Sequence, residues 1–409
     1  MIETAPLQSS AFRWFFAGRT VSLLGSFMSP VAIAFGVLEI TGSAAWLSAV
    51  TTAVLIPMVA TLLLGGGIAD RHRRDTVLAQ ASLGSGLAQA GIAALLFTHQ
   101  QPVLLLPLAA LNGVMQGLAT PALRGIVTNL AAGPGLQQAS SLLASARNLG
   151  RIAGPATAGV LTATVGAGWA VSIDAASFLV AAACFTRIHL AGPPARAHAS
   201  GMLSDLREGW RYFRSHTWIW TVTLAFAVFN ATNRGFWLIL GPVIAQDTIG
   251  ARGWGLVLSA QGVGALSATL ALARIPLMRR PMHAALLAMA LAALPLILLG
   301  TGAGLLPLAA AAFLAGIAVD LFTVVWETVN YTHIPEHLLS RVGAHDEFWS
   351  TVSFPAGQLS APLLAAVFGA PAVALTGGLV AAAVMLATSS LRPLRRIEIQ
   401  HDGNLPRAR

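Results

Sequence analysis

The stretch GGGIADRHRRD, residues 65–75, sets three arginines and two aspartates between two long apolar segments, 44–69 and 76–98. Each flanking segment exceeds the roughly 20 apolar residues that an α-helix needs to cross the hydrocarbon core of a bilayer. A transmembrane β-barrel would instead show ten-residue segments of alternating hydrophobicity. This turn and its flanks therefore predict two membrane-spanning helices joined by a very short charged loop.

The same alternation of apolar segments and short polar connectors continues outward along all 409 residues. The chain is 56% hydrophobic and 10% charged, with a mean hydropathy of +0.73, whereas soluble domains carry about 25% charged residues. The ten further apolar segments are 12–39, 103–130, 137–165, 168–188, 217–246, 253–274, 282–300, 304–332, 340–367 and 371–391. We therefore predict an all-α membrane protein with twelve transmembrane helices.

The arginines predict the orientation of these helices. All 24 basic residues are arginine, and they gather in alternate connectors. If the N-terminus is cytoplasmic, nearly all loop arginines face the cytoplasm and only Arg252 faces outward, as the positive-inside rule requires. Twelve spans place both termini on the same side. We expect a monomer in the bacterial plasma membrane with both termini cytoplasmic, surrounded by lipid.

The longest connector, 189–215, divides the chain into two sets of six segments. Its second part carries apolar residues at helical spacing with charged residues between them, which predicts an amphipathic helix on the cytoplasmic membrane surface. An ordinary, partly helical linker is the alternative. We expect four parts, namely an N-terminal bundle at 1–188, a linker at 189–215, a C-terminal bundle at 216–391 and a tail at 392–409.

The two halves also resemble each other in sequence. Gly42 and Trp46 follow the first segment, and Gly250 and Trp254 follow the seventh at the same spacing. A duplicated six-helix unit with a central cytoplasmic loop is typical of transporters that rock two bundles around a midplane site. The repeat therefore predicts two pseudo-symmetric six-helix bundles.

The charged turn contains a glycine, three residues later Asp-Arg, and then further basic residues. The positions in this pattern are Gly66, Asp70, Arg71 and Arg74. The pattern resembles the signature of the major facilitator superfamily. This resemblance implies the major facilitator fold, with these four residues as a cytoplasmic gate that latches the bundles. Arg73 and Asp75 stand where the superfamily usually has a glycine and a final basic residue, which would weaken the latch.

The fifth apolar segment carries a second similarity. Its small residues and proline are Gly150, Gly154, Pro155 and Gly159. Small residues four apart let two helices approach closely, and a proline bends a helix. The set resembles the Gly-Pro pattern of exporters in the superfamily, and generic helix packing is the alternative reading.

Five further stretches are similar to the enterobactin-exporter and macrolide-efflux branch, also called transmembrane secretion effectors: FRWFFAGRTVSLLGS, ALRGIVTNL, SARNLGRIAGP, DAASFLVAAACF and SDLREGWRYFR. The resemblance implies secondary active export of a small amphiphilic molecule, such as a drug, siderophore or secondary metabolite. It also implies proton antiport with rocking-bundle alternating access. An importer on the same fold and a transport-inactive membrane partner protein remain as alternatives.

Several polar residues fall inside the apolar segments. A charge at the bilayer centre costs about 2.5–3.5 kcal/mol on insertion scales, so it needs a partner or an aqueous cavity. Asp320 and Glu327 share a face of one helix and are our candidates for proton coupling. The candidates for lining a substrate cavity are Asn112, Gln116, Arg147, Arg151, Asn230 and Arg234. Asp174 is expected to cap or pack near the outer end of its helix.

Other chemistries find no support in the sequence. The chain has no lysine and therefore no GxxxxGK[ST] phosphate loop, which excludes ATP-driven pumping by this chain alone. Its histidines are scattered, and Cys184 is the single cysteine, so we expect no metal, no disulfide and no cofactor. No nucleophile elbow or nucleic-acid-binding domain stands out. The first 16 residues lack a signal-peptide pattern. We expect neither an enzyme nor a nucleic-acid-binding protein.

Overall fold

The computed structural model describes residues 6–69, 73–99, 101–131, 134–188, 202–274, 281–391 and 394. Within these ranges the side chains are described except at 63–69, 124, 128, 134, 202–206, 336, 337 and 340. The described chain is helical almost throughout and contains no β-strand. It divides into two compact units, which we call unit 1 (Met1–Ala197 with Pro242–Ser259) and unit 2 (His198–Gly241 with Ala260–Arg409).

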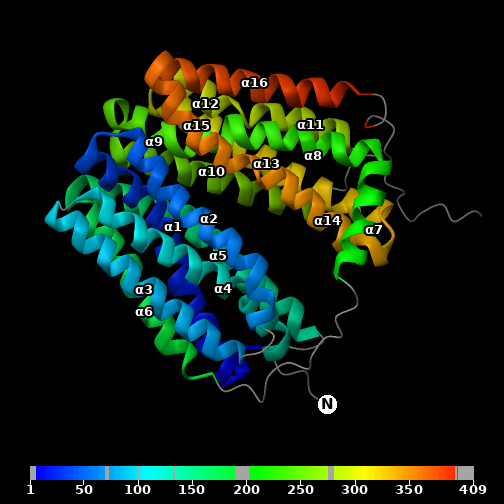
Figure 1. Cartoon of the computed structure of the whole chain (residues 1–409), viewed down its shortest axis with the longest axis horizontal. Coiled ribbons are helices and arrows are strands. Elements are labelled where there is room, and N and C mark those ends of the chain that lie inside the picture. The colour runs from blue at the N-terminus through cyan, green and yellow to red at the C-terminus, as the bar shows by residue number, and fades with distance from the viewer. Residues whose placement is uncertain are drawn as a thin grey trace, which may run out of the picture. The chain divides into compact units, whose positions relative to one another are not determined.

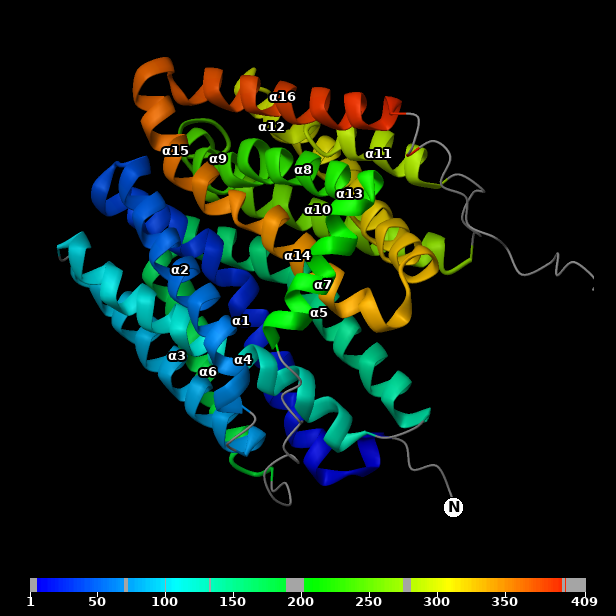
Figure 2. The ribbon, with the colours of Figure 1, turned by 45° about the vertical axis from the view of Figure 1, so that its right-hand side comes forward.

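Unit 1 is built from six long helices and two short 3₁₀ turns (Figure 1). The helices are α1 (Ser10–Thr41), α2 (Ala44–Ala69), α3 (Arg74–Thr98), α4 (Leu105–Leu130), α5 (Pro134–Thr164) and α6 (Ala167–Phe185), and the turns are η1 (Pro6–Gln8) and η2 (Pro102–Leu104). Helix α6 packs against both α1 and α3, and α2 packs against α4. In both views of the ribbon α3 and α6 run side by side (Figures 1 and 2).

Ten further helices and one π-helical turn follow in the described chain, and most of them belong to unit 2. They are α7 (Met202–Ser215), α8 (Thr217–Phe229), the π-helix η3 (Asn230–Gly235), α9 (Phe236–Thr248), α10 (Gly250–Leu272), α11 (Pro281–Leu291), α12 (Leu294–Gly300), α13 (Leu305–His333), α14 (Glu336–Thr351), α15 (Ser353–Phe368) and α16 (Ala370–Ser390). The C-terminal part of α9 and the first part of α10 cluster with unit 1. Helices α11 and α12 both pack against α13 and α16.

Ten stretches of the described helices are long and apolar enough to cross a membrane. Two of the twelve predicted spans, 137–165 and 217–246, are not among them. The first is α5, which is 31 residues long but rich in Ser, Gln and Arg. The second is interrupted by η3, which leaves α8 and α9 with 13 residues each. Both stretches are nevertheless helical along their length.

Local chemistry explains where the first helix begins and ends. The Ser9 hydroxyl accepts a hydrogen bond from the Phe12 backbone N–H at 3.4 Å and caps the N-terminus of α1. At the other end Gly42 takes a left-handed conformation with φ of 60°, and its N–H donates to the Leu38 carbonyl at 2.7 Å. These caps leave the two-residue turn that leads directly into α2.

Close helix packing in unit 1 depends on glycine. A Cβ at Gly113 of α4 would overlap the backbone carbonyl of Val54 in α2, and one at Gly117 would lie 2.6 Å from the Met58 carbonyl oxygen. Small residues of this kind bring membrane helices into van der Waals contact, because no hydrophobic driving force operates between helices in lipid. Helices α2 and α4 therefore meet backbone to backbone.

Helix α7 occupies the second part of the predicted linker and packs against α14. Glu208 forms an ion pair with Arg341, and a Cβ at Gly209 would lie 2.8 Å from the Arg341 Cβ. Phe213 is buried and packs with residues of α14, while Trp210 lies against His345 and Trp349. In both ribbon views α7 lies beside α14 (Figures 1 and 2). Whether α7 rests on the membrane surface stays a prediction.

Candidate functional site

Unit 2 contains a cavity of about 310 Å³ where the start of α8, the end of α13 and helix α14 meet. The residues that line it are Ile219, Trp326, Glu327, Asn330, Tyr331, Ile334, Leu339, Val342, Gly343 and Asp346. Most of these side chains are aliphatic or aromatic, and a few carry polar groups. This mixture is characteristic of small-molecule sites, where apolar walls provide contact and a few polar groups orient the ligand.

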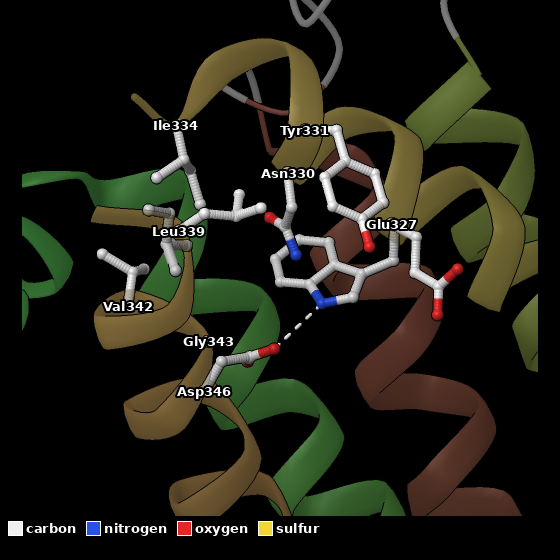
Figure 3. A pocket seen from close by; sticks show the side chains of 10 residues that line it. Glu327, Asn330, Tyr331, Ile334, Leu339, Val342, Gly343 and Asp346 are labelled. Atoms are coloured by element: carbon white, nitrogen blue, oxygen red, sulfur yellow. Dashed lines mark hydrogen bonds between the residues drawn. The ribbon is translucent and has the colours of Figure 1, made fainter. Parts of the chain in front are cut away.

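Asp346 is the most firmly held polar group of the cavity. Its Oδ1 accepts a hydrogen bond from the Thr223 hydroxyl at 2.5 Å, and its Oδ2 accepts one from the Trp326 indole N–H at 2.9 Å. Figure 3 shows the second of these bonds as a dashed line. The carboxylate thus ties α8, α13 and α14 together through two donors. Asp346 was not among the sequence candidates.

Glu327 lies on the opposite side of the cavity from Asp346. Its carboxylate points away from Asp346 in Figure 3, and its side chain is exposed. The neighbouring Asn330 has a buried Oδ1 atom without a hydrogen-bond partner in the described part of the chain. Tyr331 is 67% exposed. These three side chains offer a ligand a carboxylate, an amide and a hydroxyl within two turns of α13.

Asp320, the second proton-coupling candidate, lies two turns before Glu327 on α13 and has different neighbours. Its Oδ2 accepts a hydrogen bond from the Thr269 hydroxyl of α10 at 2.5 Å. Glycines bring these helices together, because a Cβ at Gly264 would overlap the Phe313 carbonyl and one at Gly316 would overlap that of Gln261. The close approach of α10 and α13 is what lets a short threonine side chain reach the carboxylate.

The π-helix η3 contains two of the predicted cavity residues. Asn230 is buried, and its amide donates to the Ser350 carbonyl of α14 at 2.8 Å. Asn233, one turn later, donates to the Ala292 carbonyl at 3.2 Å. Arg234 is exposed. Asn230 therefore has a structural contact in unit 2, and a role for Asn230 and Arg234 in binding stays a prediction.

The predicted cavity residues of unit 1 lie on α4 and α5. Asn112 is 2% exposed, and its Oδ1 has no hydrogen-bond partner among the described residues, while Gln116 is half-buried. Arg147 is exposed and close enough to Arg19 of α1 for their charges to repel, and Arg151 is half-buried. Asn112 and Gln116 thus form a polar pair on α4, and Arg147 and Arg151 form a basic pair on α5. Their contact with a substrate stays a prediction.

Of the four predicted gate residues, only Arg74 has described side-chain contacts. Asp70 and Arg71 lie outside the described residues, and Gly66 lies in α2 where no surroundings are described. Arg74 is described, and its guanidinium donates to the Gly125 carbonyl at 2.8 Å and to Asn129 Oδ1 at 2.6 Å. Arg74 thus fastens α3 to the C-terminal end of α4.

The two residues that depart from the superfamily signature pair with each other. Arg73 forms an ion pair with Asp75 at 2.7 Å, and this hydrogen bond raises the pKa of Arg73 above its ordinary value. Because Asp75 is 5% exposed and Arg73 is 44% exposed, the arginine lies at the surface over a buried carboxylate. The pair occupies the N-terminal turn of α3, where a carboxylate is favoured.

The small residues of α5 lie at two close contacts. Cβ atoms at Gly150 and Gly154 would lie 2.8 and 2.6 Å from the Phe27 side chain of α1. One at Gly159 would lie 2.5 Å from the Ala251 carbonyl oxygen at the start of α10, and a Cβ at Gly255 of α10 would overlap the carbonyl of Pro155. Glycine is required on both sides of the second contact.

Sequence reasoning also missed a buried polar cluster in unit 1. Asp174 of α6 is 0% exposed, and its carboxyl accepts a hydrogen bond from the Gln89 amide of α3 at 2.7 Å. The sequence predicted that Asp174 caps or packs near the end of its helix. The only feature of the sequence that indicated a buried polar cluster was a lone carboxylate in an apolar segment. Among the described residues, this cluster included, no group of three or more His, Cys, Asp or Glu side chains could hold a metal ion.

The chain is similar in sequence to a family of membrane transport proteins and to two named transporters. The profile of the transmembrane secretion effector family matches residues 2–400. The chain is 26% identical over 400 residues to the multidrug efflux pump Tap of Mycobacterium tuberculosis, covering 94% of each protein. It is 24% identical to the enterobactin exporter EntS of Shigella flexneri, covering 89% of this chain and 85% of EntS.

The fold has counterparts among solved structures. The crystal structure of the nucleoside transporter NupG superposes with a TM-score of 0.71 at 12% identity, covering 92% of this chain and 97% of NupG. At this identity the similarity shows the fold alone. The predicted all-α membrane fold with two six-helix bundles is thereby confirmed.

Proposed function

Because this chain belongs to the transmembrane secretion effector family of major facilitator transporters, we propose that it exports a small amphiphilic molecule by proton antiport. Two similar proteins are named as an efflux pump and an exporter, which supports the outward direction. The substrate classes that we propose are a drug, a siderophore or a secondary metabolite. Transport would proceed by rocking of the two bundles, so that the binding site is exposed alternately to the two sides of the membrane.

The cavity beside Asp346 is the observation that carries this proposal. Its aliphatic and aromatic wall provides apolar contact, and Glu327, Asn330 and Tyr331 provide polar groups along one side. Such a surface suits a molecule that has both an apolar body and a polar edge. A volume of about 310 Å³ lies at the lower end of the range for ligand pockets.

We propose that Asp320 and Glu327 carry the coupling proton. Both are carboxylates on α13, and each faces a different neighbour, since Asp320 binds Thr269 while Glu327 lines the cavity. A protonated carboxyl is neutral, so it crosses an apolar environment at a much lower free-energy cost than a carboxylate does. Release of the proton toward the cytoplasm would restore the charge. The six polar residues named above as cavity candidates would line the path of the substrate.

We also propose the orientation of the chain in the membrane, the boundaries of its two bundles and its oligomeric state. Both termini and the connector 189–215 would be cytoplasmic, and the boundaries of the two bundles would be 1–188 and 216–391. The chain would act as a monomer in the bacterial plasma membrane without ATP.

We further propose that Asp70, Arg71 and Arg74, with Gly66 beside them, form the cytoplasmic gate. Replacing Asp70 by asparagine removes the negative charge that this gate would need in its closed state. Transport should fall strongly for Asp70→Asn while its abundance in the membrane stays normal, as measured by efflux and by immunoblotting of the same cells. If abundance falls together with transport, Asp70 serves folding and the gate assignment is lost.

The direction of transport can be tested in cells. Cells that make the chain are loaded with each of a panel of fluorescent amphiphiles and compared with cells that lack it. The proposal predicts that cells with the chain retain less dye. Higher retention would show an importer on the same fold. Absence of flux in reconstituted vesicles for the whole panel would favour the transport-inactive partner protein.

A further inference from the structure

The buried cluster around Asp174 has no role in the proposed function so far. Asp174 lies seven residues after the first residue of α6, about 10 Å along the helix. Its side chain is 0% exposed, and Gln89 is 1% exposed. The Gln89 amide nitrogen lies 2.7 Å from Asp174 Oδ2 and 2.8 Å from the Ser29 hydroxyl oxygen of α1. Three helices of unit 1 therefore converge on one carboxyl group.

A glycine allows this convergence. A Cβ at Gly25 of α1 would lie 2.6 Å from Asp174 Oδ1 and would overlap the Ser177 hydroxyl. The Ser177 hydroxyl donates to the backbone carbonyl of Asp174 at 2.7 Å and lies 3.5 Å from its Oδ1. The backbone of α1 thus covers the carboxyl directly, and this contact shields the group from lipid and from water.

The hydrogen-bond partners of the Asp174 carboxyl in the described part of the chain are neutral. They are the Gln89 amide and the hydroxyls of Ser29 and Ser177. The charged and titratable residues on the described helices that pack against α6 are Arg13, Arg19 and Glu39 in α1, Arg74 and Asp75 in α3, and Arg147 and Arg151 in α5. None of them bonds to Asp174, so no cation among the described residues neutralises the carboxyl.

A buried carboxylate without a cation is costly. Transferring an isolated ionised carboxylate to an apolar medium costs so much free energy that such a group takes up a proton instead. The neutral acid needs only one hydrogen-bond acceptor for its O–H. The cluster must therefore supply an acceptor within reach of Asp174.

Gln89 can supply that acceptor. Its Oε1 atom is buried and has no hydrogen-bond partner in the described structure. Rotation of the amide by half a turn exchanges its oxygen and nitrogen, two atoms that structures seldom distinguish directly. The oxygen then stands 2.7 Å from Asp174 Oδ2, where it can accept the O–H of the acid. The Ser29 hydroxyl can follow, because it both donates and accepts.

We propose that Asp174 is a proton-binding site of unit 1 and that the Gln89 amide pairs with the carboxyl in both protonation states. When Asp174 is ionised, the Gln89 N–H donates to its Oδ2. When a proton binds to Oδ2, the Gln89 amide turns over, so its N–H bonds to Oδ2 and to the Ser29 oxygen break. The new O–H of Asp174 then donates to the Gln89 oxygen, and the Ser29 hydroxyl reverses to donate to the same oxygen. The buried surroundings favour the protonated state, in which the Gln89 amide is turned over relative to the orientation described.

Proton binding itself can be measured without transport. Infrared spectra of the purified full-length protein in lipid nanodiscs are compared at neutral pH for the wild type, Asp174→Asn and Glu39→Gln. Glu39 is the matched control because it is an exposed carboxylate in the same unit. The wild type and Glu39→Gln should show the carbonyl band of an un-ionised carboxylic acid that Asp174→Asn lacks. Equal bands in all three proteins would overturn the proposal.

A second variant tests the pairing with Gln89 and does not depend on the folding of Asp174→Asn. Gln89→Met keeps the length of the side chain but removes its hydrogen-bonding groups. The acid band of the otherwise native protein should move to higher wavenumber, because a carbonyl of an acid with fewer hydrogen bonds vibrates faster. A band that stays in place in Gln89→Met would show that Gln89 does not pair with the acid.

A role of Asp174 in coupling rests on the proposed function, and a transport measurement decides it. In proteoliposomes with an imposed pH gradient, Asp174→Asn should lose gradient-driven accumulation of dye while retaining exchange down the dye gradient. A variant that still accumulates dye would remove Asp174 from the coupling. If the wild type itself ignores the pH gradient, proton antiport fails as a function, and the infrared result still decides whether Asp174 binds a proton.

Discussion

At the residue scale, Asp346 holds three helices of unit 2 together, so its hydrogen bonds and its charge can be tested separately. Asp346→Asn keeps an oxygen for the Trp326 indole N–H and offers an N–H to the Thr223 hydroxyl, so stability should change little. Asp346→Leu leaves the indole N–H unpaired, which costs roughly 1–3 kcal/mol. The thermal unfolding midpoint in detergent, followed by circular dichroism, should fall for the leucine variant only.

The result for the asparagine variant is decisive. An equal fall for Asp346→Asn and Asp346→Leu would mean that the charge of Asp346, and not its hydrogen bonds, stabilises unit 2. Thr223→Val serves as the control, because it removes one of the two donors to the carboxylate but leaves the indole bond of 2.9 Å in place. Its effect should lie between those of the two Asp346 variants.

The same residues show how far sequence reasoning reaches. A carboxylate inside an apolar segment can be recognised from sequence, as Asp320 and Glu327 were. The partners of such a group cannot, because they come from distant segments: Thr223 is 123 residues from Asp346, and Gln89 is 85 residues from Asp174. Which face of each helix meets which neighbour is decided by packing, and a hydropathy pattern that is apolar all round does not record it.

At the element scale, the contact between α10 and α13 depends on the absence of side chains at two positions. Gly316→Leu would insert a side chain where even a Cβ overlaps the Gln261 carbonyl, and overpacking of this kind costs typically about 1–3 kcal/mol. We expect a lower unfolding midpoint and loss of the hydrogen bond between Thr269 and Asp320. Unfolding in detergent and gradient-driven transport in proteoliposomes measure the two effects.

The matched control for this prediction is Gly343→Leu. Gly343 is also helical and in unit 2, but a Cβ there would meet nothing within 4 Å. Its unfolding midpoint should therefore stay close to that of the wild type. If Gly316→Leu were tolerated as well as Gly343→Leu, the two helices would not pack as closely as described.

The helices themselves were largely predictable, because long apolar runs bounded by charge leave little freedom in a bilayer. The break at η3 was not. It coincides with Asn230, whose amide binds a backbone carbonyl of α14, and with Asn233, whose amide binds one in the turn between α11 and α12. It also coincides with Gly235, whose backbone lies against that of Gly357. Asparagine and glycine in an apolar segment indicate a polar contact or a close approach of two backbones. The π-helical turn could not be predicted from them, because the sequence does not show which segments they contact.

At the scale of the whole molecule, the arginine distribution predicts the orientation in the membrane. In a background of Cys184→Ala, which removes the single cysteine, Arg214→Cys and Arg252→Cys each place one thiol on an exposed position. An impermeant thiol reagent should label Arg252→Cys in intact cells. It should label Arg214→Cys only after the cells are permeabilised. The reverse pattern would invert the predicted topology.

The family could be recognised from the charged turn and the stretches along the chain, and the match over residues 2–400 confirms it. The substrate could not be predicted from the sequence, because binding depends on side chains that converge from several helices. Of the sequence candidates only Glu327 lines the cavity of unit 2. Function therefore has to be tested through the one step that every proton-coupled exporter shares, the use of a pH gradient to move substrate uphill.

The most direct test is gradient-driven transport in proteoliposomes that contain the wild type or Asp320→Asn. Asparagine keeps the size of the side chain and can still bind Thr269, but it cannot carry a proton. With an imposed pH gradient the wild type should accumulate a fluorescent amphiphile against its own gradient. Asp320→Asn should only equilibrate the dye. Uphill accumulation by Asp320→Asn would contradict its role in coupling, and its absence in the wild type would contradict proton antiport altogether.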